Sequence, residues 1–278
     1  MPHTLTIGHS PDPDDAFMFY ALTQGKIDTG EYRFEHCIED IERLNHRARR
    51  GELEITAVSL HAYAHLSDTY ALLACGSSTG KGYGPILVAR EALSPAELSQ
   101  RVIAVPGILT TAFLTLRLFA GNFNYVVVPF DQILEAVCER RADAGLVIHE
   151  GQLTFGDYGL VKAADLGAWW LEETGLPLPL GVNVVRRDLG EAAMADVARL
   201  LRQSIEYALS HREECLDYSL RYGRGLDTGR ADRFVGMYVN HYTRDFGEEG
   251  RAAVRELLGR AHAAGVIPRL PALDFVQG

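Results

Sequence analysis

Short apolar runs alternate with stretches of helical periodicity along most of the chain. The short runs end in glycine, proline or small polar residues, as strands do, whereas the longer stretches repeat apolar residues every three or four positions. Strands are expected at residues 5–8, 32–38, 54–59, 70–74, 85–89, 101–105, 125–129 and 144–148, and helices at 16–23, 41–51, 61–66, 112–120, 132–140, 191–209, 213–222, 229–239 and 248–264. This alternation predicts an α/β protein.

The order of elements predicts two α/β lobes joined by a double crossover. The larger lobe is expected at residues 1–90 and 182–278, and the smaller at 91–181. Extended crossings near 85–90 and 178–187 would join them, and a cleft between lobes is a favoured site for a small ligand. Pro177 and Pro179 favour an extended connector or an edge strand over residues 176–185 rather than a central strand. The glycine- and serine-rich residues 76–84 are expected to form a loop.

Charge and composition narrow the class of partner. The chain of 278 residues has 37 acidic and 27 basic side chains, a formal net charge of −10, and no basic stripe, which argues against nucleic acid. A small anion is still compatible with this charge, because helix N-termini and backbone amides bind anions. The sequence does not give the oligomeric state, and a homodimer stays open.

The cysteines and the N-terminus indicate a reducing compartment. The four cysteines are far apart and show neither a metal-binding spacing nor a disulfide framework: Cys37, Cys75, Cys138 and Cys215. The first ten residues run directly into a strand without the pattern of a signal peptide, and no apolar run reaches the length of a membrane span. We therefore expect a cytoplasmic protein that does not interact with membranes.

The apolar run 145–148 ends abruptly in His149, Glu150 and Gly151. It reads as a buried strand of a parallel sheet, and ligands of open α/β sheets bind just beyond the carboxyl ends of such strands. A histidine placed there suits a base that works near neutral pH. The alternative is a histidine that only hydrogen-bonds a neighbouring loop.

Other predicted strands also end in small polar residues. Ser10 follows the first strand, Ser59 the third, and Thr110 and Thr111 follow the strand at 101–105. The two threonines can cap the helix that follows, or hold a ligand carboxylate at its start, and the two roles are compatible. For Ser59, capping of the next helix is favoured. If the strands are parallel, these side chains converge on one edge of each sheet, which predicts a pocket.

Two other groups of polar residues favour structural roles. The acidic residues Asp12, Asp14 and Asp15 stand at a helix start, where capping is favoured over acid–base or metal chemistry. His61 and His65 have a spacing that can bind zinc, but no third ligand is evident. No metal site is expected.

Five segments make the chain resemble a known family. They are GHSPDPDDAFMFYAL, EITAVSLHAYA, AVPGILTTAFL, AGLVIHEGQLTFGDYGL and DLGAWWLEETGLPLPLG, spread over almost the whole sequence. Together they resemble the 1,4-dihydroxy-6-naphthoate synthases of the futalosine route to menaquinone. That family is similar in fold to the two-lobed (type II) periplasmic binding proteins, which agrees with the double crossover predicted above.

The resemblance implies an activity and a set of site residues. It implies a lyase that cleaves cyclic dehypoxanthine futalosine, a carboxylated small molecule, to the naphthoate and a three-carbon sugar fragment, without a cofactor. His149, in the IHE motif, would be the general base. Substrate contacts would fall on Ala57, Val58 and Ser59 and on the pair Thr110–Thr111. The family pattern has a lysine where this chain has Ala57, so only a backbone contact is expected there.

Two alternatives share the predicted fold. One is a solute-binding or sensing protein, which would not need His149, and for which the absence of a signal peptide is unfavourable. The other is a chorismate dehydratase of the same pathway. The HEG-x-LTF stretch favours the synthase.

Overall fold

The computed structural model describes residues 3–222 and 226–278. Within them the chain divides into two units. The first comprises residues 1–79, 179–251 and 271–278, and the second comprises 80–178 and 252–270. The second unit therefore begins before the expected boundary at residue 91, because residues 86–89 pair within its own sheet. No helix of the described residues combines the length and apolar character needed to cross a bilayer.

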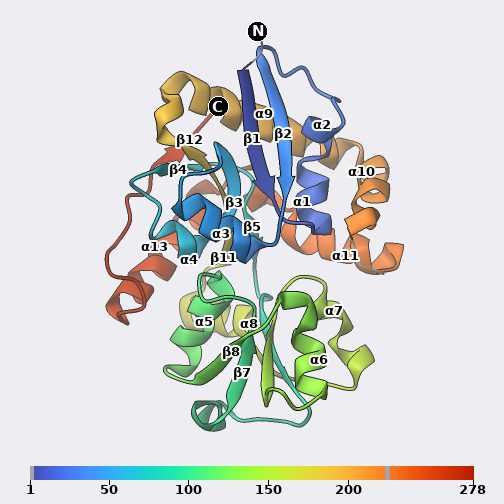
Figure 1. Ribbon diagram of the computed structural model, residues 1–278, viewed down its shortest axis with the longest axis vertical. Coiled ribbons are helices and arrows are strands. Elements are labelled where there is room, and N and C mark those ends of the chain that lie inside the picture. Colours follow the sequence, from blue (N-terminus) through green and yellow to red (C-terminus); the bar gives the residue numbers. More distant parts are fainter. Residues whose placement is uncertain (1–2, 223–225) are drawn as a thin grey trace. The chain divides into compact units, whose positions relative to one another are not determined.

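The first unit is built on a mixed sheet. Within the described residues its strands are β1 (His3–His9), β2 (Tyr32–Ile38), β3 (Ile55–Ser59), β4 (Tyr70–Leu73), β5 (Ser78–Gly80), β11 (Leu178–Arg186) and β12 (Phe275–Val276). Their order is β12-β4-β11-β3-β1-β2, with β5 paired to β11. β1 is parallel to β2 and β3, whereas β11 runs antiparallel to β3 and β4. Figure 1 shows β1 and β2 as neighbouring arrows.

Helices from both ends of the chain pack in the first unit. They are α1 (Pro13–Met18), α2 (Tyr20–Thr23), α3 (Ile41–Arg49), α4 (Leu60–Tyr63), α9 (Glu191–Ser210), α10 (Arg212–Ser219), α11 (Thr228–Tyr238), α12 (His241–Arg244) and α13 (Gly247–Ala263), the last of which ends in the second unit. The buried face of α9, including Leu201 and Ile205, packs with Phe17 and Phe19 and with Ile7 of β1. The chain enters α1 four residues after the carboxyl end of β1.

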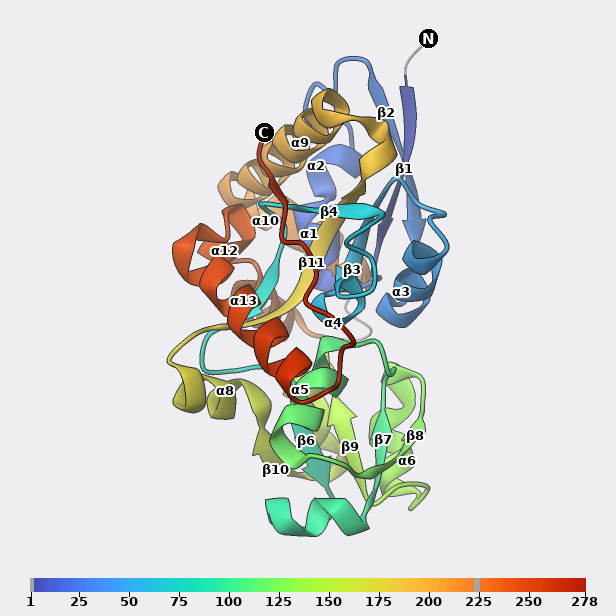
Figure 2. The same cartoon turned by 90° about the vertical axis from the view of Figure 1, so that its left-hand side faces the viewer.

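The second unit has a five-stranded sheet within the described residues. Its strands are β6 (Ile86–Ala89), β7 (Val102–Val105), β8 (Asn124–Val127), β9 (Ala144–Val147) and β10 (Val161–Asp165), in the order β10-β6-β9-β7-β8. β7 is parallel to β8 and β9, and β6 is antiparallel to β9 and β10. Figure 2 shows β6, β9 and β7 side by side. The expected strand that precedes His149 is therefore confirmed, in a sheet that is mixed rather than purely parallel.

The helices of the second unit follow its strands. They are α5 (Thr111–Ala120), α6 (Ile133–Cys138), α7 (Gly151–Thr154) and α8 (Leu166–Thr174), with 3₁₀ turns at Pro95–Gln100, Phe130–Gln132 and Phe155–Tyr158. Ile133 and Val137 of α6 lie where a Cβ on Gly145 would be, at 2.6 and 2.9 Å. Glycine at this position lets α6 approach β9 closely.

Two predictions about extended segments are wrong. Residues 178–186 form a central strand, β11, rather than an edge strand or connector. Both prolines precede Gly181, where pairing with β3 begins, so neither interrupts the part of the strand that is paired on both sides. Residues 76–84, expected as a loop, contain the short strand β5.

Candidate functional site

In the first unit, β1 and β3 bring Ser10 and Ser59 to the same edge of the sheet. The strands are parallel and pair through Ile7↔Ile55 and Gly8↔Thr56, so their carboxyl ends point the same way. Ser10 follows β1 directly, and Ser59 is the last residue of β3. Both are buried. The predicted convergence of polar strand ends is confirmed for this sheet.

Ser10 lies between two carboxyl groups. Its Oγ is 2.6 Å from Asp12 Oδ2 and 2.7 Å from Asp15 Oδ2, and its backbone N–H donates to Asp15 Oδ2 at 2.7 Å. A hydroxyl carries one proton, and an ionised carboxylate can only accept. Both short contacts are best satisfied when one of the two carboxyls carries a proton of its own. Burial raises the pKa of Asp15, against the opposing charge of His9 and the hydrogen bond from Ser10, which favours the neutral form.

The expected capping role of these acids is wrong for Asp12. Asp12 is the N-cap residue of α1, but its side chain does not cap the helix. Its carboxyl and that of Asp15 instead face Ser10, and Asp14 Oδ2 accepts a hydrogen bond from Ser78 Oγ at 3.1 Å. Asp12 and Asp15 thus hold Ser10 in the turn after β1, and Asp14 ties the helix to Ser78 of β5.

Ser59 is held by Asn45 of α3. Asn45 Oδ1 accepts the Ser59 backbone N–H at 2.8 Å, and Asn45 Nδ2 donates to Ser59 Oγ at 3.1 Å. Ser59 is the N-cap residue of α4, yet its side chain makes no capping hydrogen bond. The prediction that Ser59 caps this helix is therefore wrong, because its hydroxyl oxygen faces Asn45.

Ala57 and Val58 lie inside β3 and are buried. The last partner of β3 on β1 is at Thr56, while β11 continues to pair with β3 as far as Ser59. The strand therefore extends beyond β1 on one side at Ala57. This is consistent with a backbone contact at Ala57, the only kind that its methyl side chain leaves.

In the second unit, three parallel strands bring their following residues to one edge. His149 and Glu150 follow β9, Thr110 and Thr111 follow β7, and Phe130 follows β8. The rings of Phe130 and His149 meet edge to face, with their centroids 4.8 Å apart and their planes at 71°. The predicted convergence is therefore confirmed for this sheet too, and the structure adds Phe130 to it.

His149 has a backbone conformation that residues other than glycine rarely adopt. Its φ is +55°, in the left-handed region, and its side chain is half-buried. This φ turns the chain sharply between the end of β9 and α7, whose start is stabilised by a hydrogen bond from Gln152 N to His149 O at 3.2 Å. Strain of this kind is often found at functional sites.

Thr110 caps α5, which was one of the two roles expected for it, the other being to hold a ligand carboxylate. Its Oγ1 accepts the Phe113 N–H at 3.1 Å and donates to Gly107 O at 2.8 Å, so both functions of the hydroxyl are used. Thr111 is the first residue of α5 and is buried. The first turn of α5 contains no acidic residue, and the positive end of the helix dipole favours an anion there.

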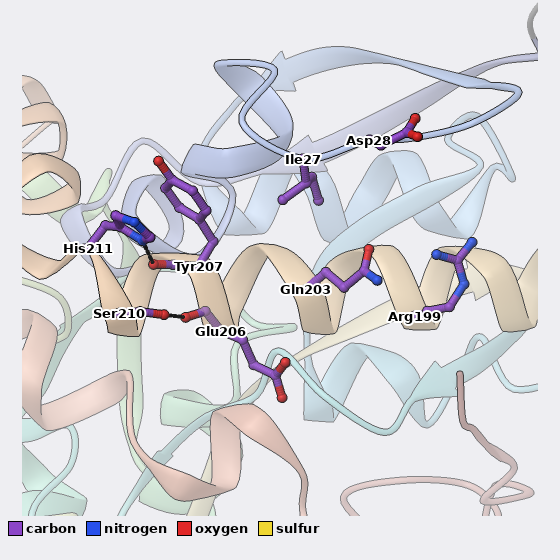
Figure 3. A pocket seen from close by; sticks show the side chains of 8 residues that line it. All are labelled: Ile27, Asp28, Arg199, Gln203, Glu206, Tyr207, Ser210 and His211. Atoms are coloured by element: carbon purple, nitrogen blue, oxygen red, sulfur yellow. Dashed lines mark hydrogen bonds between the residues drawn. The ribbon is translucent and has the colours of Figure 1, made fainter.

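A groove elsewhere on the first unit contains none of these residues. It runs along α9, has a volume of about 580 Å³, and is lined by Ile27, Asp28, Arg199, Gln203, Glu206, Tyr207, Ser210 and His211 (Figure 3). Tyr207 stacks on His211 with ring centroids 4.0 Å apart. Ile27 and Asp28 belong to the connection that enters β2 at its amino end, opposite the edge that carries Ser10 and Ser59.

Within residues 3–222 and 226–278, no group of three or more His, Cys, Asp or Glu side chains is placed to hold a metal ion. His61 and His65 do face each other on one turn, with ring centroids 6.0 Å apart.

The family model for menaquinone biosynthesis matches residues 5–263. The chain belongs to the menaquinone biosynthesis family. The resemblance inferred from the five sequence segments is thereby confirmed.

Two curated relatives give the family membership more detail. Both are named 1,4-dihydroxy-6-naphthoate synthase. One, from Thermus thermophilus, is 43% identical over 272 residues, 98% of this chain and 99% of the relative. The other, from Streptomyces coelicolor, is 42% identical over 273 residues, 96% of each chain. The chain is therefore an enzyme of menaquinone biosynthesis.

Solved structures confirm the fold. The crystal structure of AF1704 from Archaeoglobus fulgidus has a TM-score of 0.92 and 49% identity, covering 95% of this chain and 99% of that one. The alkanesulfonate-binding protein SsuA from Xanthomonas axonopodis pv. citri, bound to MOPS, has a TM-score of 0.74 at 13% identity, covering 97% and 96%. The family member described here thus has the periplasmic-binding-protein-like fold that the sequence predicted.

Sequence reasoning missed Asn45 and Phe130. Asn45 is fully buried in α3 beside Leu44 and Ala48. A polar side chain within the buried face of an amphipathic helix was the signal available for Asn45. Phe130 gave no such signal, because an aromatic residue after a strand is ordinarily part of the core.

Proposed function

We propose that this enzyme cleaves cyclic dehypoxanthine futalosine to 1,4-dihydroxy-6-naphthoate and a three-carbon sugar fragment. Two kinds of observation support the proposal. The curated relatives over nearly the whole chain are named for this product. The structure places His149 on the same sheet edge as the start of α5, where an anion is favoured.

His149 is proposed as the general base. The observation that carries this assignment is its position directly after β9, in a strained turn beside Phe130. The imidazole takes a proton from the sugar-derived part of the substrate. The carbon–carbon bond to that part then breaks, and the electron pair left behind makes the second ring of the naphthalene aromatic. A base whose pKa lies near the working pH is well suited to this step.

The remaining residues are proposed to bind the substrate. Thr111 and the positive end of the α5 dipole, whose first turn has no acidic residue, would hold a carboxylate. Thr110 would act through its backbone, because its hydroxyl is already used in the cap. Ser10, Ser59 and the backbone of Ala57 and Val58 are proposed as contacts supplied by the first unit.

The test is incubation of the purified chain with cyclic dehypoxanthine futalosine. We expect 1,4-dihydroxy-6-naphthoate to appear, detected by absorbance and by mass, and to form at least about a hundredfold more slowly with the His149→Asn variant. A wild-type chain that binds this compound without converting it would support a solute-binding protein instead. Consumption of chorismate in a parallel incubation would identify a dehydratase.

A further inference from the structure

Ser59 has a buried hydroxyl whose proton is not used by the protein. Its exposed fraction is 4%, and its Oγ accepts a hydrogen bond from Asn45 Nδ2. Within residues 3–222 and 226–278, this hydroxyl donates no hydrogen bond, and it does not cap α4. A buried donor without an acceptor is unfavourable, so a bound group that supplies one would be stabilised.

The orientation of the Asn45 amide is fixed by two neighbours. The backbone N–H of Ser59 can only donate, so the amide atom 2.8 Å away must be Oδ1. On its other side, Nδ2 is 3.3 Å from a carboxylate oxygen of Glu42, which accepts. A flipped amide would place donor against donor and acceptor against acceptor. Asn45 therefore presents N–H to Ser59 Oγ.

This orientation sets the direction of the Ser59 hydroxyl. Because the oxygen already accepts from Asn45, the hydroxyl proton points away from α3 and is left to donate. The hydroxyls of Thr110 and Ser10 already have protein partners. Thr110 both accepts and donates within its cap, and Ser10 lies between the carboxyls of Asp12 and Asp15. Ser59 is thus a donor prepared by its neighbour.

We propose that Asn45 is a positioning residue that fixes Ser59 as a hydrogen-bond donor. The substrate atom bound at Ser59 is then an acceptor oxygen, a carboxylate or a carbonyl, rather than a hydroxyl or an amine. This inference rests on the proposed function only for the identity of the substrate. That the Ser59 hydroxyl donates a hydrogen bond to the ligand can be tested with any ligand that binds there.

The deciding variant is Asn45→Asp. One oxygen of the introduced carboxylate still accepts the Ser59 backbone N–H, while the other replaces the N–H donor with an acceptor. The Ser59 hydroxyl then turns to donate to that carboxylate and is no longer available to the ligand. We expect KM for cyclic dehypoxanthine futalosine to rise about ten- to a hundredfold, the usual effect of losing a hydrogen bond to a charged or strongly polar group. We expect kcat to change little, because the contact is made equally to substrate and transition state.

Further variants and the pH dependence separate this role from a structural one. Ser59→Ala should raise KM by a similar factor, and the double variant should be no worse than either single one, since both remove the same donor. Glu42→Gln combined with Asn45→Asp removes the repulsion between the two carboxylates but keeps the hydrogen bond from the Ser59 hydroxyl to the introduced carboxylate. This combined variant should therefore keep the raised KM of Asn45→Asp. The loss in Asn45→Asp should also diminish at acid pH, because a protonated carboxyl donates to Ser59 Oγ as the amide does.

The outcomes are distinct from those that test the proposed function. If the wild-type chain forms no naphthoate, the same variants are compared by calorimetry with 1,4-dihydroxy-6-naphthoate, which needs no turnover. Weaker binding by Asn45→Asp and Ser59→Ala, without further loss in the double variant, supports the inference. Unchanged binding by Asn45→Asp overturns it, as do single effects that multiply in the double variant or no binding of the naphthoate by the wild type.

Discussion

The ring of Phe130 meets the ring of His149 edge to face, with centroids 4.8 Å apart. The two residues follow different strands, β8 and β9: Phe130 begins the 3₁₀ turn Phe130–Gln132, and His149 lies in the turn before α7. An edge-to-face contact of this kind favours one ring orientation over others. Phe130 therefore restricts the orientation of the imidazole that we propose as the base.

Replacement of His149 by asparagine should stop turnover and keep binding. We expect kcat to fall at least about a hundredfold, the lower end of what a general base contributes. Affinity for the product naphthoate should stay within about tenfold, because the base is not the main anchor. Asparagine is the right replacement because it tolerates the positive φ of this position, whereas alanine would add backbone strain.

The measurement is a pair of assays on the same protein. Steady-state kinetics gives kcat, and calorimetry with the naphthoate gives affinity. A His149→Asn enzyme that turns over at the wild-type rate would show that the base is elsewhere. A matched change, His65→Asn on the first unit, should leave kcat unaltered.

The adjacent threonines allow a sharper comparison. Thr110→Val removes the cap of α5, and we expect the free energy of unfolding to fall by about 0.5–2 kcal/mol. Thr111→Val should instead weaken binding of the product carboxylate and change stability less. Urea denaturation and calorimetry on both variants distinguish the two effects. If Thr111→Val binds the naphthoate as tightly as the wild type does, the carboxylate is bound elsewhere.

Most of the sheet positions could be predicted from the sequence, because most of the strands are short apolar or alternating runs that end in small polar residues, whereas β5, β10 and β12 were not predicted. The same pattern correctly brought Ser10 and Ser59 to one edge, and Thr110, Thr111 and His149 to another. These predictions succeeded because the direction of parallel strands follows from their helical connections.

What failed depends on contacts that are distant in sequence. The central position of β11 depends on pairing with β3 and β4, which no local pattern shows. The role of Ser59 depends on Asn45, fourteen residues earlier and on another element. The left-handed φ of His149 was also hidden, because histidine carries no signal for it.

His36 should make the stability depend on pH. Burial, and then the neighbouring His9, lower the pKa of His36 from 6.5 to about 4. Between these values the unfolded chain holds a proton that the folded chain does not. The contribution is therefore fully present above pH 6.5 and is lost as the pH falls towards 4.

A His36→Gln variant should lose stability less steeply than the wild type over this range. The measurement is urea denaturation at intervals from pH 4.5 to 7. His262→Gln, at an exposed position of α13, is the control that should keep the wild-type slope. His9 remains in the variant, and its pKa is also lowered by burial, so part of the slope should persist. A slope equal to that of the wild type would contradict the assignment.

Gly167 should be intolerant of a side chain even though it lies in a helix. A Cβ at this position would lie 2.0 Å from the carbonyl carbon of Tyr83 and 2.1 Å from its oxygen, both backbone atoms that cannot rotate away. We expect Gly167→Ala to lower the free energy of unfolding by about 3 kcal/mol, at the upper end for overpacking.

Gly259→Ala in α13 is the matched control. Outside the neighbouring backbone of its own helix, no heavy atom lies within 4 Å of its Cβ, so the higher helix propensity of alanine should raise stability by about 0.5–1 kcal/mol. Urea denaturation of the two variants should shift the midpoint in opposite directions, and a Gly167→Ala protein as stable as the wild type would show that α8 can move away from Tyr83.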